Sequence, residues 1–193
     1  MKIYKLGEEV LREKCTDVLP EEINDSFRAT LEEMFTTMIS ANGVGLAAPQ
    51  VGIAKRFFVV MADDETRRVF INPVITKTSG DLVEYEEGCL SIPGVYEKIM
   101  RPSKISVSAL DENGKKFVIE DATDLLARVI QHEYDHLDGV LYIDRGDEEF
   151  AKETAEQFKR KAERAAKKAE EKAKKQASIA AKLAAKQKKK ESK

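Results

Sequence analysis

The sequence predicts an α+β fold in which short antiparallel strands pack around one buried helix, and a long helix follows at the C-terminus. Large apolar residues recur at three- and four-residue spacing over residues 24–40 and 121–139, as expected of helices that pack on a core. Short runs rich in β-branched and aromatic residues lie between these segments and are typical of strands. A strand-rich middle flanked by helices favours α+β over a regularly alternating βαβ chain.

The first predicted helix covers residues 24–40 and begins with polar residues that can serve as N-caps. Its apolar positions are Phe27, Leu31, Met34, Phe35, Met38 and Ile39. Two strands are predicted over residues 56–61 and 69–75 because both runs are apolar and β-branched. Ile105, Val107 and Ala109 then alternate with polar residues, and the sequence DENG at residues 111–114 separates them from an apolar run at residues 117–119. This pattern predicts a hairpin with a four-residue loop.

The second predicted helix lies within residues 121–139, with capping residues in front and Gly139 behind. Its apolar residues at helical spacing are Leu125, Leu126, Val129, Ile130 and Leu137. We expect this helix to be buried in the domain. It carries both histidines of the chain.

The chain has 193 residues, of which 42% are hydrophobic, so one domain with an ordinary core is expected. We assign residues 1–146 to that domain and residues 147–193 to a basic, Ala/Lys-rich helical tail, which contains no Gly or Pro. The net charge of −2 divides unequally: the domain has 17 basic against 26 acidic residues, and the tail has 16 against 9. Little core burial is expected in the tail, whose large apolar residues are Phe150, Phe158, Ile179 and Leu183.

The start of the chain lacks the apolar run of a secretory signal, and no apolar stretch is long enough to cross a bilayer. A cytoplasmic protein with no membrane partner is therefore expected. In a reducing compartment no disulfide is expected between the two cysteines, Cys15 and Cys89. Cys15 carries no motif and is interpreted as a surface or shallow packed thiol.

Both histidines belong to an HExxH sequence formed by His132, Glu133 and His136. At about 3.6 residues per turn, the two imidazoles lie on one helix face about one turn apart, close enough to share a metal ion. Glu133 points to the side of the pair, where it can reach a water on the metal. The alternative is a pair of ordinary histidines on a solvated helix face, which the spacing disfavours.

A catalytic site of this type needs a third protein ligand. Downstream of His136 there is no further His or Cys, and the carboxylates Asp138 and Asp144 follow too soon after the helix. Upstream, Cys89 follows Gly88, and a thiolate is a strong ligand for a borderline metal. Cys89 is therefore the candidate third ligand.

Three segments resemble the three motifs of the peptide deformylase family, in the expected order. They are GVGLAAPQ at residues 43–50, EGCLS at residues 87–91 and QHEYDHLDG at residues 131–139. The resemblance extends from about Met1 to Arg145. It implies an α+β catalytic domain, the ligands Cys89, His132 and His136, and N-formyl-methionyl nascent peptides as substrates that release formate.

The resemblance also implies roles for individual residues. Glu133 is the general base, and the Gln50 side-chain amide and the Leu90 backbone N–H stabilise the oxyanion. The loop Gly43–Gly45 holds the peptide, with the Gly45 carbonyl on the formamide N–H. An apolar pocket for methionine is expected from Val44, Leu125 and Val129, although the last two could equally be core residues. One divalent metal per chain is implied, Fe²⁺ in the cell, with Zn²⁺ or Ni²⁺ able to replace it in purified protein.

Several assignments stay open. Arg128 lies near the histidine face, where its stem could line the pocket mouth while its guanidinium meets solvent or a carboxylate. Tyr96 stands where some relatives have a substrate-contacting arginine. Asp135, Glu87 and Glu86 are all candidate partners for the second nitrogen of a histidine ligand.

Two other functions compete with deformylation. A zinc peptidase of the HExxH class would use a downstream Glu or His ligand, and the Cys89 motif argues against it. An inactive binding module would act through the tail, and the intact ligand and base set argues against that. From Lys159 onward the tail has 15 basic against 4 acidic residues, a net charge of +11 suited to phosphate backbones. Together with the family resemblance, this charge favours the ribosome and its RNA as a partner; no oligomer is implied. The alternative is a solvated helix with no partner, held by Glu–Lys pairs at i,i+4 spacing.

Overall fold

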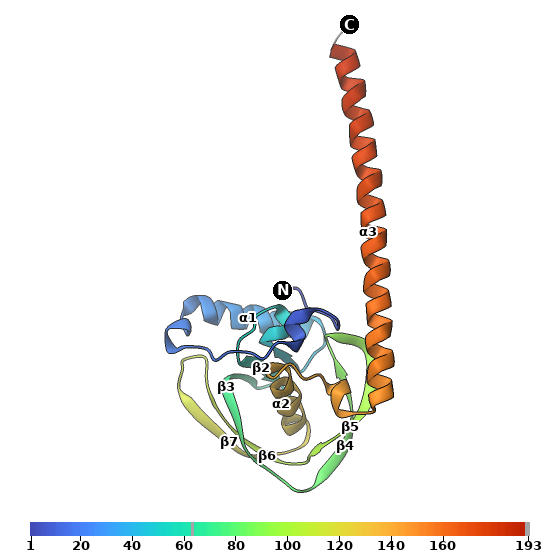
Figure 1. The fold of residues 1–193 in the computed structure, drawn as a ribbon. Helices are drawn as coiled ribbons and strands as arrows, with labels where there is room; N and C mark the ends of the chain where they lie inside the picture. The colour runs from blue at the N-terminus through green and yellow to red at the C-terminus, as the bar shows by residue number, and fades with distance from the viewer. Residues whose placement is uncertain (63, 192–193) are drawn as a thin grey trace. The chain divides into compact units, whose positions relative to one another are not determined.

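The computed structural model describes residues 1–62 and 64–191, and side chains as far as Ala177. In this part of the chain there are three α-helices and seven strands, all paired antiparallel, which confirms the predicted α+β class (Figure 1). The contacts divide the chain into two compact units, Met1–Lys152 and Glu153–Lys193. No helix in the described ranges is long and apolar enough to cross a membrane.

The larger sheet has five strands in the order β1-β2-β3-β6-β7. Their bounds are Gly45–Ala47, Phe57–Met61, Arg67–Thr78, Ile105–Leu110 and Lys116–Ala122. The strands predicted at residues 56–61 and 69–75 correspond to β2 and to the middle of a longer β3. The β6–β7 loop is one residue longer than predicted, because the Asp111 side chain accepts hydrogen bonds from the backbone N–H groups of Asn113 and Lys115. Gly114 completes the turn at a φ of +75°.

A second sheet consists of β4, Leu82–Cys89, and β5, Ile92–Pro102, which form a hairpin that the sequence did not predict. The pairing is regular from Leu82↔Pro102 to Gly88↔Tyr96 and then shifts, so that Cys89 pairs with Ile92. Cys89 therefore lies at an irregularity next to a tight turn. Such irregularities redirect side chains out of the regular strand pattern.

Helix α1, Asp25–Ser40, begins where the Asn24 side chain accepts a hydrogen bond from the backbone N–H of Phe27. Its buried residues are Leu31, Met34, Phe35 and Met38, and they pack with apolar residues of β1, β2 and β3. Ile39, counted among the apolar positions of this helix, is instead 48% exposed. The spacing at three and four residues thus identified the buried face apart from its last position.

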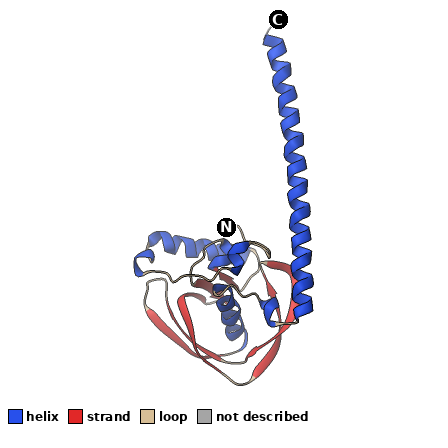
Figure 2. Cartoon of the chain, in the orientation of Figure 1, coloured by secondary structure: helices blue, strands red, loops and turns tan. Residues whose placement is uncertain are grey.

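Helix α2, Asp124–Leu137, lies among the strands of the domain (Figure 2) and is buried over most of its length. It starts after residue 121 because β7 continues to Ala122. Its apolar residues join Phe58, Phe70 and Val107 of the large sheet in one core cluster. The helix ends before Gly139, which adopts a φ of +71°.

Cys15 belongs to the same core cluster and is only 4% exposed. The surface position considered for it is therefore wrong, and it is a fully packed thiol. Burial raises the pKa of Cys15 to about 11, because a thiolate is poorly solvated there.

Helix α3 spans Glu148–Glu191. Ion pairs at i,i+4 spacing support it, including Arg160–Glu156 at 3.0 Å. These exposed pairs each contribute only a few tenths of a kcal/mol, about 0.3–0.5. The side chains of Ile179 and Leu183, and the tail residues Ser192 and Lys193, lie outside the described residues.

Candidate active site

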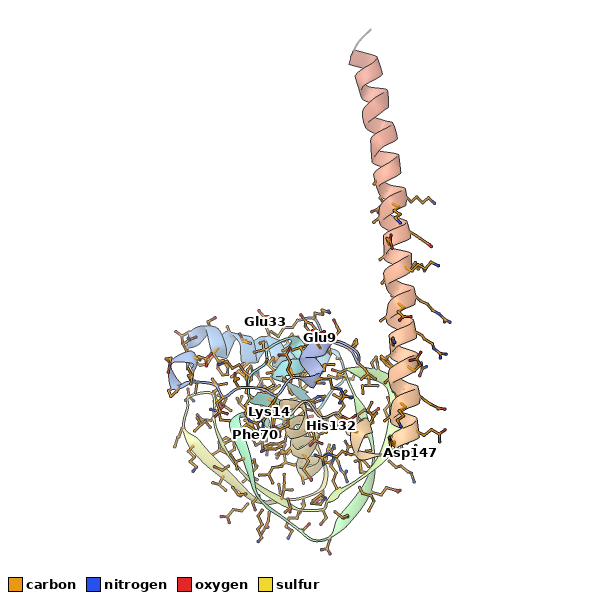
Figure 3. All side chains as sticks on the ribbon, in the orientation of Figure 1. Glu9, Lys14, Glu33, Phe70, His132 and Asp147 are labelled. Carbon is orange, nitrogen blue, oxygen red and sulfur yellow. The ribbon has the colours of Figure 1, made fainter. Side chains whose placement is uncertain are left out.

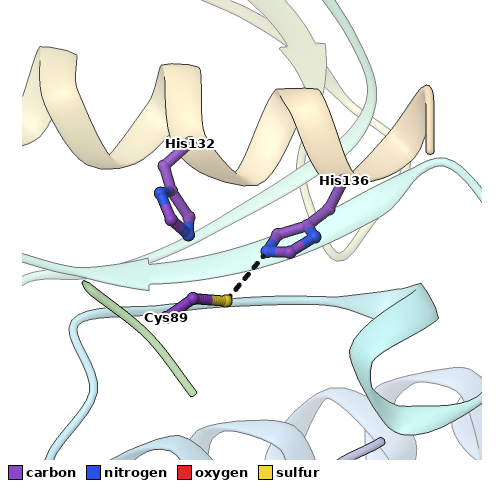
Figure 4. A group of neighbouring side chains, drawn as sticks. All are labelled: Cys89, His132 and His136. Carbon is purple, nitrogen blue, oxygen red and sulfur yellow. Dashed lines mark hydrogen bonds between the residues drawn. The ribbon is translucent and has the colours of Figure 1, made fainter. Parts of the chain in front are cut away.

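Cys89 and the two histidines converge in the interior of the domain. Helix α2 carries His132 in the interior of the domain (Figure 3). It presents His132 and His136 one turn apart, with ring centroids 5.2 Å from each other, and the β4–β5 hairpin brings Cys89 to face them (Figure 4). The Cys89 Sγ lies 3.4 Å from His136 Nε2. One ligand atom from each residue falls within 4.8 Å of the other two. The structure thus brings together the three residues that the sequence nominated as metal ligands.

The donor set fits a borderline divalent metal, since one thiolate and two neutral imidazoles suit iron, nickel and zinc. His132 Nδ1 is engaged with Glu87, which leaves Nε2 for the common centre. His136 is 1% exposed, and its Nδ1 has no hydrogen-bond partner among the described residues. Burial lowers the pKa of His136 well below its ordinary value, which favours the neutral imidazole that binds metals.

Of the three carboxylates that the sequence left open as partners of a histidine ligand, Glu87 is the one that orients His132. Its Oε2 lies 2.8 Å from His132 Nδ1. Arg101 donates two hydrogen bonds to the same carboxylate, from Nε at 2.7 Å and from Nη2 at 3.0 Å. Asp135 instead accepts hydrogen bonds from Arg101 Nη1 at 2.7 Å and from Arg145 Nη2 at 2.6 Å. A carboxylate behind a ligating histidine fixes both its ring orientation and its tautomer.

The charges around Glu87 and His132 favour a cation at the site. Burial raises the pKa of Glu87, but the hydrogen bonds from His132 and Arg101 outweigh it and hold that pKa well below the ordinary value. Burial lowers the pKa of His132, yet the adjacent Cys89 and Glu87 side chains raise it well above normal. Negative charge at Cys89 and Glu87 therefore stabilises a positive charge between them, either a proton on the imidazole or a metal ion.

Glu133 lies beside the ligand cluster and is 4% exposed. Its Oε2 has no hydrogen-bond partner in the described part of the chain. The backbone of Gly45 approaches the carboxylate so closely that a Cβ at that position would overlap Glu133 Oε1 and Val129 Cγ1. Burial raises the pKa of Glu133 to about 7, a value at which a carboxyl group can both accept and donate a proton near neutrality.

The Gln50 side chain reaches the same point from the short helix Ala48–Val51. Its Oε1 accepts a hydrogen bond from the Ala47 backbone N–H at 2.8 Å, so the amide orientation places Nε2 toward the site. Nε2 donates to Cys89 Sγ at 3.3 Å and to Ser91 Oγ at 3.2 Å. A neutral donor therefore lies in contact with the cysteine sulfur.

A cleft of about 590 Å³ opens in front of these residues. Its walls include every predicted substrate-binding residue, namely Gly43, Val44, Gly45, Leu125 and Val129, together with Gln50, Cys89, Leu90, His132 and Glu133. The sequence missed the contributions of Lys5, Tyr85, Ile92 and Val95. Only a correct prediction of the β4–β5 hairpin could have indicated the last three.

Arg128 and Tyr96 also line the cleft, with different surroundings. Arg128 is 7% exposed, and its guanidinium donates to Glu87 Oε1 at 2.8 Å and to the carbonyls of Ile99 and Val83. Of the two surroundings considered for Arg128, the carboxylate is right and solvent is wrong. Tyr96 is 62% exposed, and its ring packs so near Gly88 that a Cβ there would lie 2.7 Å from Cε1.

Comparisons with known proteins agree with one another. The sequence profile of the family described as polypeptide deformylase matches residues 1–152. A peptide deformylase of Treponema pallidum is 53% identical over 141 residues, which cover 72% of this chain and 86% of that protein. Peptide deformylase 1 of Clostridium perfringens is 55% identical over 138 residues, covering 71% and 91%. The crystal structure of a peptide deformylase from Synechococcus elongatus in complex with actinonin has a TM-score of 0.73 at 47% identity, covering 79% and 82%.

Proposed function

The chain belongs to the peptide deformylase family, and on this premise we propose that the cleft in front of Cys89, His132 and His136 is its deformylation site. The enzyme removes the N-formyl group from the N-terminal methionine of nascent polypeptides and releases formate. The observation that carries the site assignment is the convergence of the three candidate ligands beside Glu133, whose Oε2 has no hydrogen-bond partner among the described residues. A peptidase of the HExxH class would not need the cysteine ligand.

Cys89, His132 and His136 would hold one divalent cation. When bound, this cation supplies Lewis-acid polarisation and lowers the pKa of a coordinated water. Glu133 accepts the proton of the attacking water as the new C–O bond forms at the formyl carbon. It then returns that proton to the amine nitrogen as the C–N bond breaks. The products are formate and a free methionyl N-terminus.

Two donors stabilise the negative charge that develops on the formyl oxygen. They are the Gln50 side-chain amide, whose orientation is fixed by its bond to Ala47, and the Leu90 backbone N–H. Because the surrounding contacts already hold Gln50, little reorganisation is needed when charge appears.

The peptide lies along Gly43–Gly45, with the Gly45 carbonyl accepting the formamide N–H. The methionine side chain enters the part of the cleft formed by Val44, Leu125 and Val129. Val129 is 5% exposed, and its Cγ1 lies next to Gly45, so a larger residue at position 45 would close this pocket. Apolar walls with a few fixed polar groups are the usual composition of such sites.

Metal removal and replacement test the assignment. We expect wild-type enzyme to release formate from formyl-Met-Ala-Ser, to stop after chelation, and to recover on anaerobic addition of metal. Fe²⁺ should give a clearly faster enzyme than Zn²⁺, with Ni²⁺ as a further comparison, although the Irving–Williams order gives Fe²⁺ the weaker affinity. Formate release that survives complete metal removal would contradict the proposal, and a faster zinc form would reject iron as the working metal.

We further propose that residues 1–146 form the catalytic domain of a cytoplasmic enzyme and that the tail, residues 147–193, binds ribosomal RNA. The substrate is a nascent chain, so an enzyme bound to the ribosome near the point where the chain emerges would meet a higher local concentration of substrate. The tail charge supports this, because Lys and Arg side chains neutralise phosphates and release counterions.

Removal of residues 165–193 is expected to leave hydrolysis of a short formyl peptide almost unchanged and to abolish co-sedimentation with ribosomes at low salt. The segment carries 11 lysines against 3 glutamates, and its contribution should fall steeply as salt rises. A matched variant with these 11 lysines changed to Gln keeps a helix-forming sequence and should also fail to bind. Equal co-sedimentation of the full-length and either altered protein would contradict RNA binding through this charge.

A further inference from the structure

We propose that Lys5 is a positioning residue of the active site and that it acts on the Cys89 sulfur through the Leu90–Ser91 peptide group. This inference rests on the proposed site but concerns a segment with no motif of its own. Three consecutive residues, Tyr4 to Leu6, contact both elements that supply the proposed oxyanion donors. The Tyr4 N–H donates to the Gln50 carbonyl at 2.8 Å, and the Leu6 N–H donates to the Ser91 carbonyl at 3.0 Å.

Between these two backbone bonds, the Lys5 ammonium donates to the Leu90 carbonyl at 2.7 Å. That distance is typical of a charge-assisted hydrogen bond, which is roughly twice as strong as a neutral one. The same peptide group carries the Ser91 N–H, which donates to Cys89 Sγ at 3.4 Å. A continuous path therefore runs from the ammonium through one planar amide to the sulfur.

The direction of the effect follows from amide resonance. A cation on the carbonyl oxygen draws electron density from the nitrogen, so the Ser91 N–H becomes a stronger donor. A stronger donor stabilises negative charge on the sulfur and weakens the electron donation of the thiolate to a cation. Lys5 thereby makes the centre more electrophilic, and it holds Leu90 in a fixed orientation from its carbonyl side.

Lys5 is itself held in place by Glu8. Its backbone N–H donates to Glu8 Oε2 at 2.6 Å. Glu8 also forms an ion pair with Lys2, but that pair is exposed to solvent and contributes little, so the loss of Lys2 leaves the bond between Glu8 and the Lys5 backbone in place. Lys5 lines the cleft, whereas the Lys2 side chain is 64% exposed and does not line it. Lys2 is therefore a matched control, because it has the same charge and belongs to the same segment.

The test compares Lys5→Met, Lys5→Arg and Lys2→Met. For Lys5→Met we expect kcat to fall about tenfold with KM changed less than about twofold, since the donors and the centre act mainly in the transition state. In the Co²⁺-substituted protein, the sulfur-to-cobalt charge-transfer band should move to longer wavelength, because the thiolate has become a better donor. Lys5→Arg should restore most of the wild-type kcat and most of the wild-type position of the charge-transfer band. Lys2→Met should leave both at wild-type levels.

Unchanged kcat and an unchanged cobalt spectrum in folded Lys5→Met would overturn the proposal, even if its melting temperature falls, because Lys5 would then only anchor the segment. An equal loss in Lys2→Met would also overturn it. Lys5→Gln serves the same comparison if Lys5→Met does not fold. Failure of the deformylase assignment is a separate result: it would appear as no formate release by the wild type, while the spectral shift would still report the link to Cys89.

Discussion

Replacing Glu133 by Gln is expected to lower kcat for formate release by about 10²–10⁴-fold while the protein keeps its metal. A positioned general base contributes about this factor. The substitution preserves the shape of a side chain that is 4% exposed and tightly packed against Gly45, so a steric explanation is avoided. The three candidate ligands, Cys89, His132 and His136, are untouched.

Activity assays and elemental analysis of the same preparation separate the two roles. Glu120→Gln, an exposed position on β7, provides a control for the loss of one carboxylate and should retain both activity and metal. Cys89→Ala should instead lose the metal, and activity with it, because it removes a ligand although the base stays in place. Turnover near the wild-type level in metal-loaded Glu133→Gln would reject Glu133 as the proton carrier.

The helices and the histidine pair could be predicted because both follow from local spacing. His132 and His136 need only the period of one helix, and Leu31, Met34 and Phe35 mark a buried face in the same way. Cys89 was nominated by the chemistry of a third ligand, and the motif resemblance added Gln50 and Leu90; all three come from other parts of the chain. The cleft indeed gathers these residues, whose roles in catalysis stay predictions.

The β4–β5 hairpin could not be predicted, and its pattern explains why. A half-buried strand normally shows apolar residues on its inner face. Here two of the inward residues are Glu87 and Arg101, both less than 6% exposed, while Leu82 and Val83 are about half exposed. The apolar residues Leu82 and Val83 therefore do not mark the buried face of this hairpin, and the polar residues Glu87 and Arg101 do not mark the exposed one. The choice of Glu87 over Asp135 as the partner of His132 depends on how this hairpin packs on α2, which no local rule supplies.

Glu87→Gln is expected to lower the free energy of unfolding by about 3–5 kcal/mol, the range for removal of one partner from a buried ion pair. Three donors converge on this carboxylate: His132 Nδ1, Arg101 with two bonds, and Arg128. Gln offers one acceptor oxygen, and its NH₂ group would meet other donors. At least one buried cation would then lose its partner.

The same substitution is expected to weaken metal binding by about 10–100-fold, because the imidazole of His132 loses the acceptor that fixes its ring. Metal loss on titration with a chelator measures this effect, and urea unfolding of apoprotein measures the stability effect without metal linkage. Glu84→Gln is the matched control, since Glu84 lies on the same strand and pairs with Lys98 at 2.8 Å, but with both side chains more than half exposed. An exposed pair contributes about 0–1 kcal/mol, so Glu84→Gln should change neither measurement appreciably. If the two variants behave alike, burial of the Glu87 cluster does not support the metal centre, and His132 must be held by the packing of α2 alone.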